Sequence, residues 1–235
     1  MALKYKLIYN PKAGTKRHLV SQKPDISLNL LKYLAKRYEL NVDFFATQKP
    51  NHATELAKNS TNEGYDVVIA AGGDGTVGEV ANGLALTEIP LGILPFGTFM
   101  NVATMLSIPR DMEQAMLLIK MGKTRKIDLG SVSVISGEIP EKPYYFLEYA
   151  GIGLDANIQR AVVAYEQRKY VIALNFLKLA LRSYNWPATI KIGNEKEISV
   201  KASLITVANG NKNRGKPGNN AQVKTQRPSS YHFHI

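Results

Sequence analysis

The sequence predicts an α/β protein: a parallel β-sheet with helices on both faces, followed by a second, mainly antiparallel domain. Three observations predict it. Apolar runs of strand length alternate with stretches of helical periodicity over roughly the first 120 residues. One run, Asp66–Ala71, is apolar throughout after its first residue, as expected of a strand buried on both faces. Beyond about residue 125, short β-like runs take over.

The elements of the first part follow from their periodicity. Tyr5–Tyr9 is a β-run that stops at Asn10-Pro11, and Ser27–Tyr38 places apolar side chains at helical spacing. The other predicted strands are Val42–Ala46, Asp66–Ala71 and Leu91–Leu94, and the other predicted helices are His52–Ser60, Thr76–Leu86 and Asp111–Met121. This alternation indicates βαβ units, and therefore a parallel sheet.

The later part differs in rhythm. It contains the short β-like runs Lys126–Ile135, Tyr144–Ala150, Ala188–Ile192, Ile198–Lys201 and Leu204–Ala208, and one helical block, Ile158–Tyr184. We therefore expect an α/β domain over residues 1–124 and a mainly antiparallel domain over residues 125–209. Residues 210–235 are polar and lack an apolar period, so we expect them to form a disordered tail.

Composition narrows the class of protein. The absence of cysteine excludes disulfides, thiolate zinc sites and cysteine nucleophiles, and it fits a reducing compartment. The apolar runs are too short to span a bilayer and the N-terminus has no export signal, so the expected location is cytoplasmic. Thirty basic against nineteen acidic residues give a net charge of +11, which suits phosphates, nucleic acid or an acidic membrane face.

The strongest motif runs from Ala70 to Gly83, directly after a buried strand. Its glycines let the backbone turn tightly and approach a ligand, while the helix that it opens presents free N–H groups and a positive dipole end. Such a helix start favours phosphate. Asp74 could hold a metal-bound phosphate or a ribose hydroxyl, and Thr76 could cap the helix or donate to a phosphate. Taken alone, the motif is nearly as compatible with an ordinary glycine-rich turn.

Two further turns favour the phosphate interpretation. Asn10–Arg17 follows the first strand and is basic, and Pro95–Thr98 follows the strand Leu91–Leu94 and opens another helix. In a parallel sheet, all three turns lie at the carboxyl ends of strands, where open α/β folds bind ligands.

These segments resemble the diacylglycerol kinase catalytic-domain family, which includes bacterial lipid kinases and sphingosine kinases. The resemblance extends nearly from Tyr5 to Asn209. Its marks are Asn10-Pro-x-Ala-Gly14, Gly72-Gly-Asp-Gly-Thr76 with Glu79 and Asn82-Gly83, Leu91-Gly-Ile-Leu-Pro-x-Gly-Thr98, Ile127-Asp-Leu-Gly130, Gly151-Ile-Gly-Leu-Asp-Ala156 and Val207-Ala-Asn-Gly210. The glycine–aspartate motif alone is shared with NAD kinases and phosphofructokinase-like enzymes, whereas the ordered set is much more specific.

The resemblance implies an NAD kinase/phosphofructokinase-like nucleotide domain followed by a β-sandwich, incomplete here, with ATP and substrate meeting between them. It implies ATP and Mg²⁺ as cofactors and a neutral lipid such as diacylglycerol as acceptor. The implied nucleotide-binding residues are Asn10, Gly14, Thr47, Gly72, Gly73, Asp74, Gly75, Thr76, Val77, Gly78, Glu79 and Thr98. No residue is assigned as a protein metal ligand, and no nucleic acid is expected as a partner.

The chain departs from the family at one position in this region. The family reads Gly-Thr-x-Asn-Asp-Phe-Ala, whereas this chain has Met100-Asn101 in place of the Asn-Asp pair. The replacement removes a carboxylate close to the nucleotide.

Three weaker candidates have simpler explanations. The apolar stretch Tyr170–Tyr184 could receive a lipid tail or touch a membrane, although packing against the second domain is the more ordinary role. His232 and His234 lack accompanying carboxylates for a metal site. Lys12, Lys16 and Arg17 lack the aromatic interleaving typical of nucleic-acid binding, so phosphate or anionic lipid fits them better.

The leading functional hypothesis is a cytoplasmic lipid kinase, peripheral at the anionic inner membrane face, that phosphorylates the hydroxyl of diacylglycerol or a related lipid. The alternatives are an NAD kinase-type phosphotransferase and a non-catalytic nucleotide- or lipid-binding remnant. If Asp74 faces the metal or ribose, Asp74→Ala lowers nucleotide affinity with little change in thermal stability.

The C-terminal part predicts an inactive chain. Relatives place a late aspartate, taken as the general base, in a Leu-x-Asp-Gly segment, whereas no Asp or Glu follows Glu197 here. Reading degenerate codons for Lys216–Ile235 one base later permits Thr-Pro and Leu-Asn-Asp in the family's order. We therefore expect a frameshift near Arg214-Gly215, natural or from sequencing, with a divergent native tail as the alternative.

Overall fold

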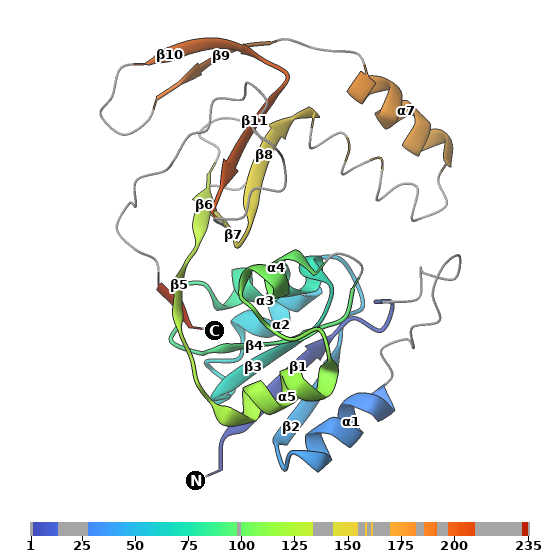
Figure 1. Cartoon of the computed structure of the whole chain (residues 1–235), viewed down its shortest axis with the longest axis vertical. Coiled ribbons are helices and arrows are strands. Elements are labelled where there is room, and N and C mark those ends of the chain that lie inside the picture. Colours follow the sequence, from blue (N-terminus) through green and yellow to red (C-terminus); the bar gives the residue numbers. More distant parts are fainter. Residues whose placement is uncertain are drawn as a thin grey trace. The chain divides into compact units, whose positions relative to one another are not determined.

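The chain's first part forms a four-stranded parallel sheet with strand order β2-β1-β3-β4 (Figure 1). Its strands are β1 (Lys4–Tyr9), β2 (Asn41–Ala46), β3 (Val67–Gly72) and β4 (Leu91–Pro95). The computed structural model describes residues 2–13, 28–97, 100–133, 143–154, 158, 161, 170–181, 186–191, 197–209 and 232–234. The predicted α/β class with a parallel sheet is confirmed.

Helices cover both faces of this sheet. They are α1 (Leu28–Arg37), α2 (His52–Lys58), α3 (Asp74–Leu84), α4 (Asn101–Met105) and α5 (Met112–Met121). Helix α1 packs against α5 and α2 packs against α3, one pair on each side of the sheet (Figure 1). The helix predicted at Thr76–Leu86 begins two residues earlier, at Asp74, so the glycine turn is itself partly helical.

The ends of α5 show why the sequence stops and starts helices where it does. The Asp111 carboxylate accepts a hydrogen bond from the backbone N–H of Gln114 at 2.9 Å, which satisfies one of the free donors of the first turn. Gly122 ends the helix with a φ of 65°, a conformation that costs glycine little.

The core lies on both faces of the sheet, because both faces carry helices. Every side chain of β1 from Tyr5 to Tyr9 is buried, and so is every residue of β3 from Val68 to Gly72. One of these residues is charged: the side chain of Lys6 is fully buried. The apolar pattern of β3 predicted this burial, whereas nothing in the sequence marked Lys6 as a core residue.

The rest of the described chain is mainly antiparallel, as predicted. Its elements are β5 (Lys126–Asp128), β6 (Gly130–Val132), β7 (Tyr144–Phe146), β8 (Tyr149–Gly153), α7 (Tyr170–Leu181), β9 (Trp186–Ile190), β10 (Ile198–Ala202), β11 (Leu204–Ala208) and β12 (His232–His234). The pairs are β5 with β12, β6 with β7, β8 with β11, and β9 with β10. A sandwich built from these pairs stays a prediction.

Two predicted runs are each divided into two strands. Lys126–Ile135 breaks at Leu129, and Tyr144–Ala150 breaks near Leu147. Both leucines are buried in the core of the first part, and the ladder is interrupted where their side chains turn inward.

Contacts divide the chain into two compact units. Of the described residues, those up to Glu148, Asn209 and His232–His234 form one unit, and those from Tyr149 to Ala208 form the other. Strands β5, β6 and β7 therefore group with the parallel sheet, although the boundary expected from the change of rhythm lies at residue 125. The reason is tertiary: Nδ2 of Asn82 in α3 donates to the Tyr145 carbonyl of β7 at 2.6 Å.

The C-terminal strand β12 falls within the segment predicted to be a disordered tail. At these three residues the structure differs from the prediction, because the backbone of His232–His234 pairs with β5. Periodicity in so short a segment carries no signal for such a pairing. Residues 210–231, with the Arg214-Gly215 position, lie outside the described residues.

Candidate active site at the carboxyl edge of the sheet

The predicted loops meet at the carboxyl edge of the sheet. The Asn10 N–H donates to the Ala71 carbonyl at 3.2 Å, and the Thr47 N–H donates to the Tyr9 carbonyl at 2.9 Å. The Phe96 N–H donates to the Gly72 carbonyl at 2.8 Å. These bonds extend the ladders into the loops, so the residues after all four strands are held side by side. Gly14 and Thr98 lie outside the described residues.

The strand order places this edge where α/β folds bind ligands. From β1 the chain proceeds to β2 on one side, and β3 and β4 follow on the other side. The connections therefore diverge between β1 and β3, which leaves a crevice outside the carboxyl ends of these two strands. Asn10 follows β1 and Gly73 follows β3, so both predicted loops border that switch point. We call the assembly of Asn10, Thr47, 72–78 and 96–97 the glycine edge.

Two glycine turns touch each other at the glycine edge. A Cβ on Gly97 would lie 2.8 Å from Cα of Gly73, and a Cβ on Gly72 would lie 2.6 Å from Oγ1 of Thr76. These distances are shorter than real Cβ contacts, so both positions require glycine for space. Thr76 is buried against Gly72, a packing role that the sequence did not specify.

The start of α3 has no side-chain cap, and two of its glycines leave backbone uncovered. No side chain caps the helix at Gly73. Apart from the backbone of α3 and the adjacent residues, no described atom lies within 4 Å of where a Cβ would be on Gly75 or Gly78. Because the first N–H groups of a helix lack partners within the helix, this exposed backbone suits an anion. Phosphate binding by this turn stays a prediction.

Asp74 has a different environment from the one expected. Its Oδ2 accepts the N–H of Asn101 at 3.1 Å and its Oδ1 accepts the N–H of Val102 at 3.0 Å. The carboxylate therefore caps α4 and joins the two glycine turns. Met100, which replaces a family asparagine, is buried with a φ of 53° and lies next to Gly97.

Glu79 also binds backbone. Its two carboxylate oxygens accept the N–H groups of Asn51, at 3.1 Å, and Ala53, at 3.2 Å, at the start of α2. The Thr54 hydroxyl donates to the Glu79 carbonyl at 2.9 Å. Glu79 thus fixes α2 against α3, which gives its spacing from the glycine turn a structural explanation.

Asn10 and Asn209 hold loops through their side-chain amides. Oδ1 of Asn10 accepts the Lys12 N–H at 2.9 Å, which shapes the loop after β1 as expected. Nδ2 of Asn209 donates to the carbonyls of Asp128, at 2.7 Å, and Leu147, at 3.1 Å. Asn209 therefore links the end of β5 to the turn after β7 within the first compact unit.

Burial raises the pKa of the Tyr144 hydroxyl above its usual value, and the nearby Glu79 carboxylate raises it further. A hydrogen bond with Asn82 acts in the opposite direction. Sequence reasoning did not select Tyr144. The helical spacing of Glu79 and Asn82 is the signal that could have placed a polar partner over this face of α3.

The described residues offer no dedicated magnesium site. No group of three or more His, Asp or Glu side chains among them could hold a metal ion. Each oxygen of Asp74 accepts one backbone N–H, and contact of this carboxylate with a metal-bound phosphate or a ribose hydroxyl stays a prediction. The side chains of His232 and His234 lie outside the described residues.

Comparison with known proteins identifies the family. A model of the diacylglycerol kinase catalytic domain matches residues 4–132, more than half of the chain. The chain belongs to the diacylglycerol kinase catalytic domain family.

Relatives and solved structures agree with this assignment. Diacylglycerol kinases of Staphylococcus aureus strains bovine RF122 / ET3-1 and MRSA252 are 39% identical over 137 residues, 57% of this chain and 41% of theirs. A diacylglycerol kinase structure from Bacillus anthracis str. Sterne has a TM-score of 0.61 at 28% identity, covering 88% of this chain and 66% of that one. Another structure from the same organism has a TM-score of 0.64 at 26% identity, covering 94% and 72%.

The chain thus spans about two fifths of the length of the curated relatives that it matches. The matched residues 4–132 include the whole described glycine edge, so this part of the family fold is present with its characteristic turns. None of the described helices is long and apolar enough to cross a membrane.

Proposed function

We propose that the glycine edge binds ATP and directs transfer of its terminal phosphoryl group to the hydroxyl of diacylglycerol or a related neutral lipid. The observation that carries the proposal is the uncapped start of α3, with bare backbone at Gly75 and Gly78, at the topological switch point of the sheet. Membership of the diacylglycerol kinase catalytic domain family supports the reaction class.

The proposed roles follow from what phosphoryl transfer requires, which is mainly positioning and neutralisation of charge. The N–H groups at the start of α3 hold phosphate oxygens, and the helix dipole favours their negative charge. Asn10 and Thr47 shape the neighbouring loops. Asp74 acts as a positioning residue: by capping α4 it fixes the second glycine turn against the first.

Magnesium belongs to the proposal only as a partner of the nucleotide. In such reactions Mg²⁺ neutralises charge on the phosphates and is often held by one or two carboxylates together with the phosphates themselves. No residue of the described chain is assigned to it.

A lipid acceptor implies that the reaction takes place at a membrane surface. We propose that this surface is anionic. The net charge of +11 supports this, because each basic residue near an anionic surface contributes about 1 kcal/mol of attraction. The proposal places the protein at the membrane periphery in the cytoplasm.

The test is incubation of the purified protein with radiolabelled ATP, Mg²⁺ and vesicles containing diacylglycerol, with NAD present in a parallel reaction. Label in a lipid product supports the proposal, and label in NADP overturns it in favour of an NAD kinase-type enzyme. Saturable ATP binding without label in any acceptor indicates the non-catalytic alternative. Lipid labelling by the 235-residue chain would also overturn the prediction that a late aspartate is required.

A further inference from the structure

A pocket lies at the edge of the sheet opposite to the glycine edge. Its volume is about 490 Å³, and the residues that line it include Tyr5, Val67 and Leu91, near the starts of β1, β3 and β4. The glycine edge lies at the carboxyl ends of these strands. The pocket is therefore separate from the proposed nucleotide site, and it lies wholly within the first compact unit.

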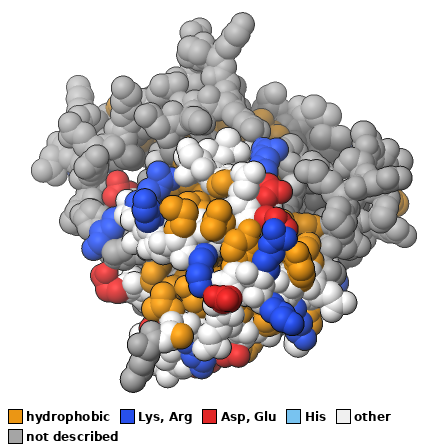
Figure 2. Space-filling view, turned by 60° about the horizontal axis from the view of Figure 1, so that its bottom comes forward, with side chains coloured by type: hydrophobic (Ala, Val, Ile, Leu, Met, Phe, Trp, Pro, Cys, Tyr) orange, Lys and Arg blue, Asp and Glu red, His pale blue; other side chains and the backbone are white. Residues whose placement is uncertain are grey.

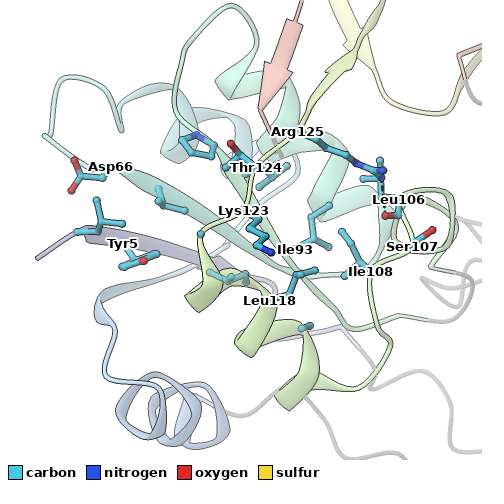
Figure 3. A pocket seen from close by; sticks show the side chains of 18 residues that line it. Tyr5, Asp66, Ile93, Leu106, Ser107, Ile108, Leu118, Lys123, Thr124 and Arg125 are labelled. Carbon is cyan, nitrogen blue, oxygen red and sulfur yellow. Dashed lines mark hydrogen bonds between the residues drawn. The ribbon is translucent and has the colours of Figure 1, made fainter.

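The walls of this pocket are mostly apolar. Ile93 of β4, Ile108 of the loop before α5, and Leu118 and Ile119 of α5 contribute side chains to it (Figure 3). On the face that carries α5 and the start of β1, hydrophobic side chains gather with lysines and arginines among them (Figure 2). Such an apolar cavity of this size is typical of a small-molecule site rather than of a packing defect.

One cation faces this apolar space. Figure 3 shows the amino group of Lys123 directed between Ile93 and Leu118. Lys123 has no hydrogen bond or ion pair among the described residues. Arg125, at the same rim, is already engaged, because its Nη2 donates to the Leu106 carbonyl at 2.7 Å.

The acidic residue of the rim does not neutralise Lys123. Oδ2 of Asp66 accepts the backbone N–H of Lys4 at 2.7 Å, and Figure 3 places Asp66 at the far side of the pocket with Tyr5. The charge that faces the apolar walls is therefore positive. A matching ligand has an anionic group at one end and an apolar body.

We propose that this pocket binds one acyl chain of an amphiphile, with its anionic head group paired to Lys123. A nucleotide fits less well, because the helix end that lines the pocket is the C-terminus of α5 at Gly122, which presents carbonyl groups and no free N–H donors to phosphates. The proposal does not depend on ATP binding or on lipid kinase activity. The amphiphile has two sources, a free fatty acid or an anionic phospholipid of a bilayer.

The test for the free acid is calorimetric titration of the purified protein with sodium dodecanoate below its micellar concentration. We expect one saturable site. Decanoate should bind on the order of tenfold more weakly, because each buried methylene contributes about fourfold in affinity. Absence of saturable binding to both dodecanoate and phosphatidylglycerol vesicles would overturn the proposal.

Two variants test the geometry. Lys123→Met should weaken dodecanoate binding about fivefold, and Leu118→Trp should weaken it further by filling the pocket. The matched controls are Lys120→Met and Leu117→Trp, exposed neighbours on α5 that do not line the pocket. Equal losses in the controls, or equally tight binding of uncharged dodecyl maltoside, would contradict the proposed site.

Vesicle flotation separates the two sources. If the ligand is a bilayer lipid, Lys123→Met and Leu118→Trp reduce binding to phosphatidylglycerol vesicles while their controls do not. If only dodecanoate binding shows this dependence, the ligand is a free acid. Both outcomes support an amphiphile whose acyl chain enters the pocket and whose anionic head group pairs with Lys123. Thermal unfolding of each variant without ligand confirms that the fold is intact.

Discussion

Asp74 illustrates how one residue can serve a site without facing the ligand. Its carboxylate holds two N–H groups at the start of α4, so removing it leaves both donors without their partner. The structure therefore revises the expectation that Asp74→Ala changes nucleotide affinity alone.

We predict that Asp74→Ala lowers the free energy of unfolding by about 1–3 kcal/mol and weakens ATP binding as well. Urea unfolding and ATP titration measure the two effects. Asp111→Ala is the matched control, because it removes the cap of α5, whose bonded groups are not part of the glycine edge: it should cost about 1 kcal/mol and leave ATP binding unchanged. Unchanged stability of Asp74→Ala would restore the direct metal- or ribose-binding role.

Lys6 is an ion-pairing residue inside the sheet. Its Nζ donates to the Leu56 carbonyl at 2.7 Å and to Oε2 of Glu63 at 2.5 Å, and it lies over the rings of Phe45 and Tyr65. The contacts bring together the central strand, α2 and the loop before β3.

We predict that Lys6→Ala destabilises the protein by about 2–5 kcal/mol, because it removes the bonds of the buried amino group to Leu56 and Glu63 and leaves a cavity. Lys6→Met should cost less, since it keeps most of the buried methylene stem. Urea unfolding of the two variants decides between charge and packing. A larger loss in Lys6→Met than in Lys6→Ala would contradict the account.

The environment of Tyr65 predicts how the free energy of unfolding depends on pH. Burial, and then its hydrogen bond to Asp43, raise the pKa of this hydroxyl to about 12 from 10.0. The unfolded chain therefore loses this proton first as pH rises. The contribution of Tyr65 to stability is fully present below about pH 10 and is lost between about pH 10 and 12.

The measurement is the free energy of unfolding across this pH range for the wild type and Tyr65→Phe, with tyrosinate absorbance as a direct readout. The wild type should show a fall in stability that is reduced in the variant, and the variant should lack one late-titrating tyrosine. A normal pKa for every tyrosine of the folded protein would contradict this prediction.

Helix α3 is the element that links the fold to the site, and two of its glycines have opposite surroundings. A Cβ on Gly83 would lie 2.5 Å from the Thr54 carbonyl oxygen and 2.7 Å from Cβ of Ala57, so glycine lets α2 and α3 approach closely. Gly78 has open space at the same position.

We predict that Gly83→Ala destabilises the protein by about 1–3 kcal/mol despite the better helix propensity of alanine. Gly78→Ala should instead gain about 0.5–1 kcal/mol in stability, while it weakens ATP binding by narrowing the phosphate cradle. Urea unfolding and ATP titration of this pair test the assignment. Tighter ATP binding by Gly78→Ala would show that phosphate does not approach there.

At the scale of the whole molecule, the excess positive charge controls the proposed membrane contact. We predict that binding to acidic vesicles exceeds binding to neutral vesicles and falls as salt rises, because salt screens exposed charges. Vesicle sedimentation over a salt series measures this. Binding that does not depend on salt, or that occurs with neutral vesicles only, would point to the exposed apolar side chains of α7, among them Val171 and Leu174.

The sequence by itself determined the parallel sheet, its element order and the position of the glycine edge. These features rest on local signals: apolar runs that only a doubly covered strand can bury, and glycines that only turns require. The resemblance of ordered motifs also indicated the family correctly. The sequence also predicts that the loops after these strands lie together, because parallel strands bring their carboxyl ends to one edge of the sheet.

Only the tertiary structure decided which carboxylates hold the backbone of other elements. The motif spacing does not show that Asp74 caps α4 or that Glu79 caps α2, since the N–H groups they bind lie 27 and 28 residues away for Asp74 and 28 and 26 for Glu79. Nor does a lysine in a β-run reveal that its side chain is buried and forms an ion pair with Glu63. Such partners are set by packing between distant elements, which periodicity and composition do not encode.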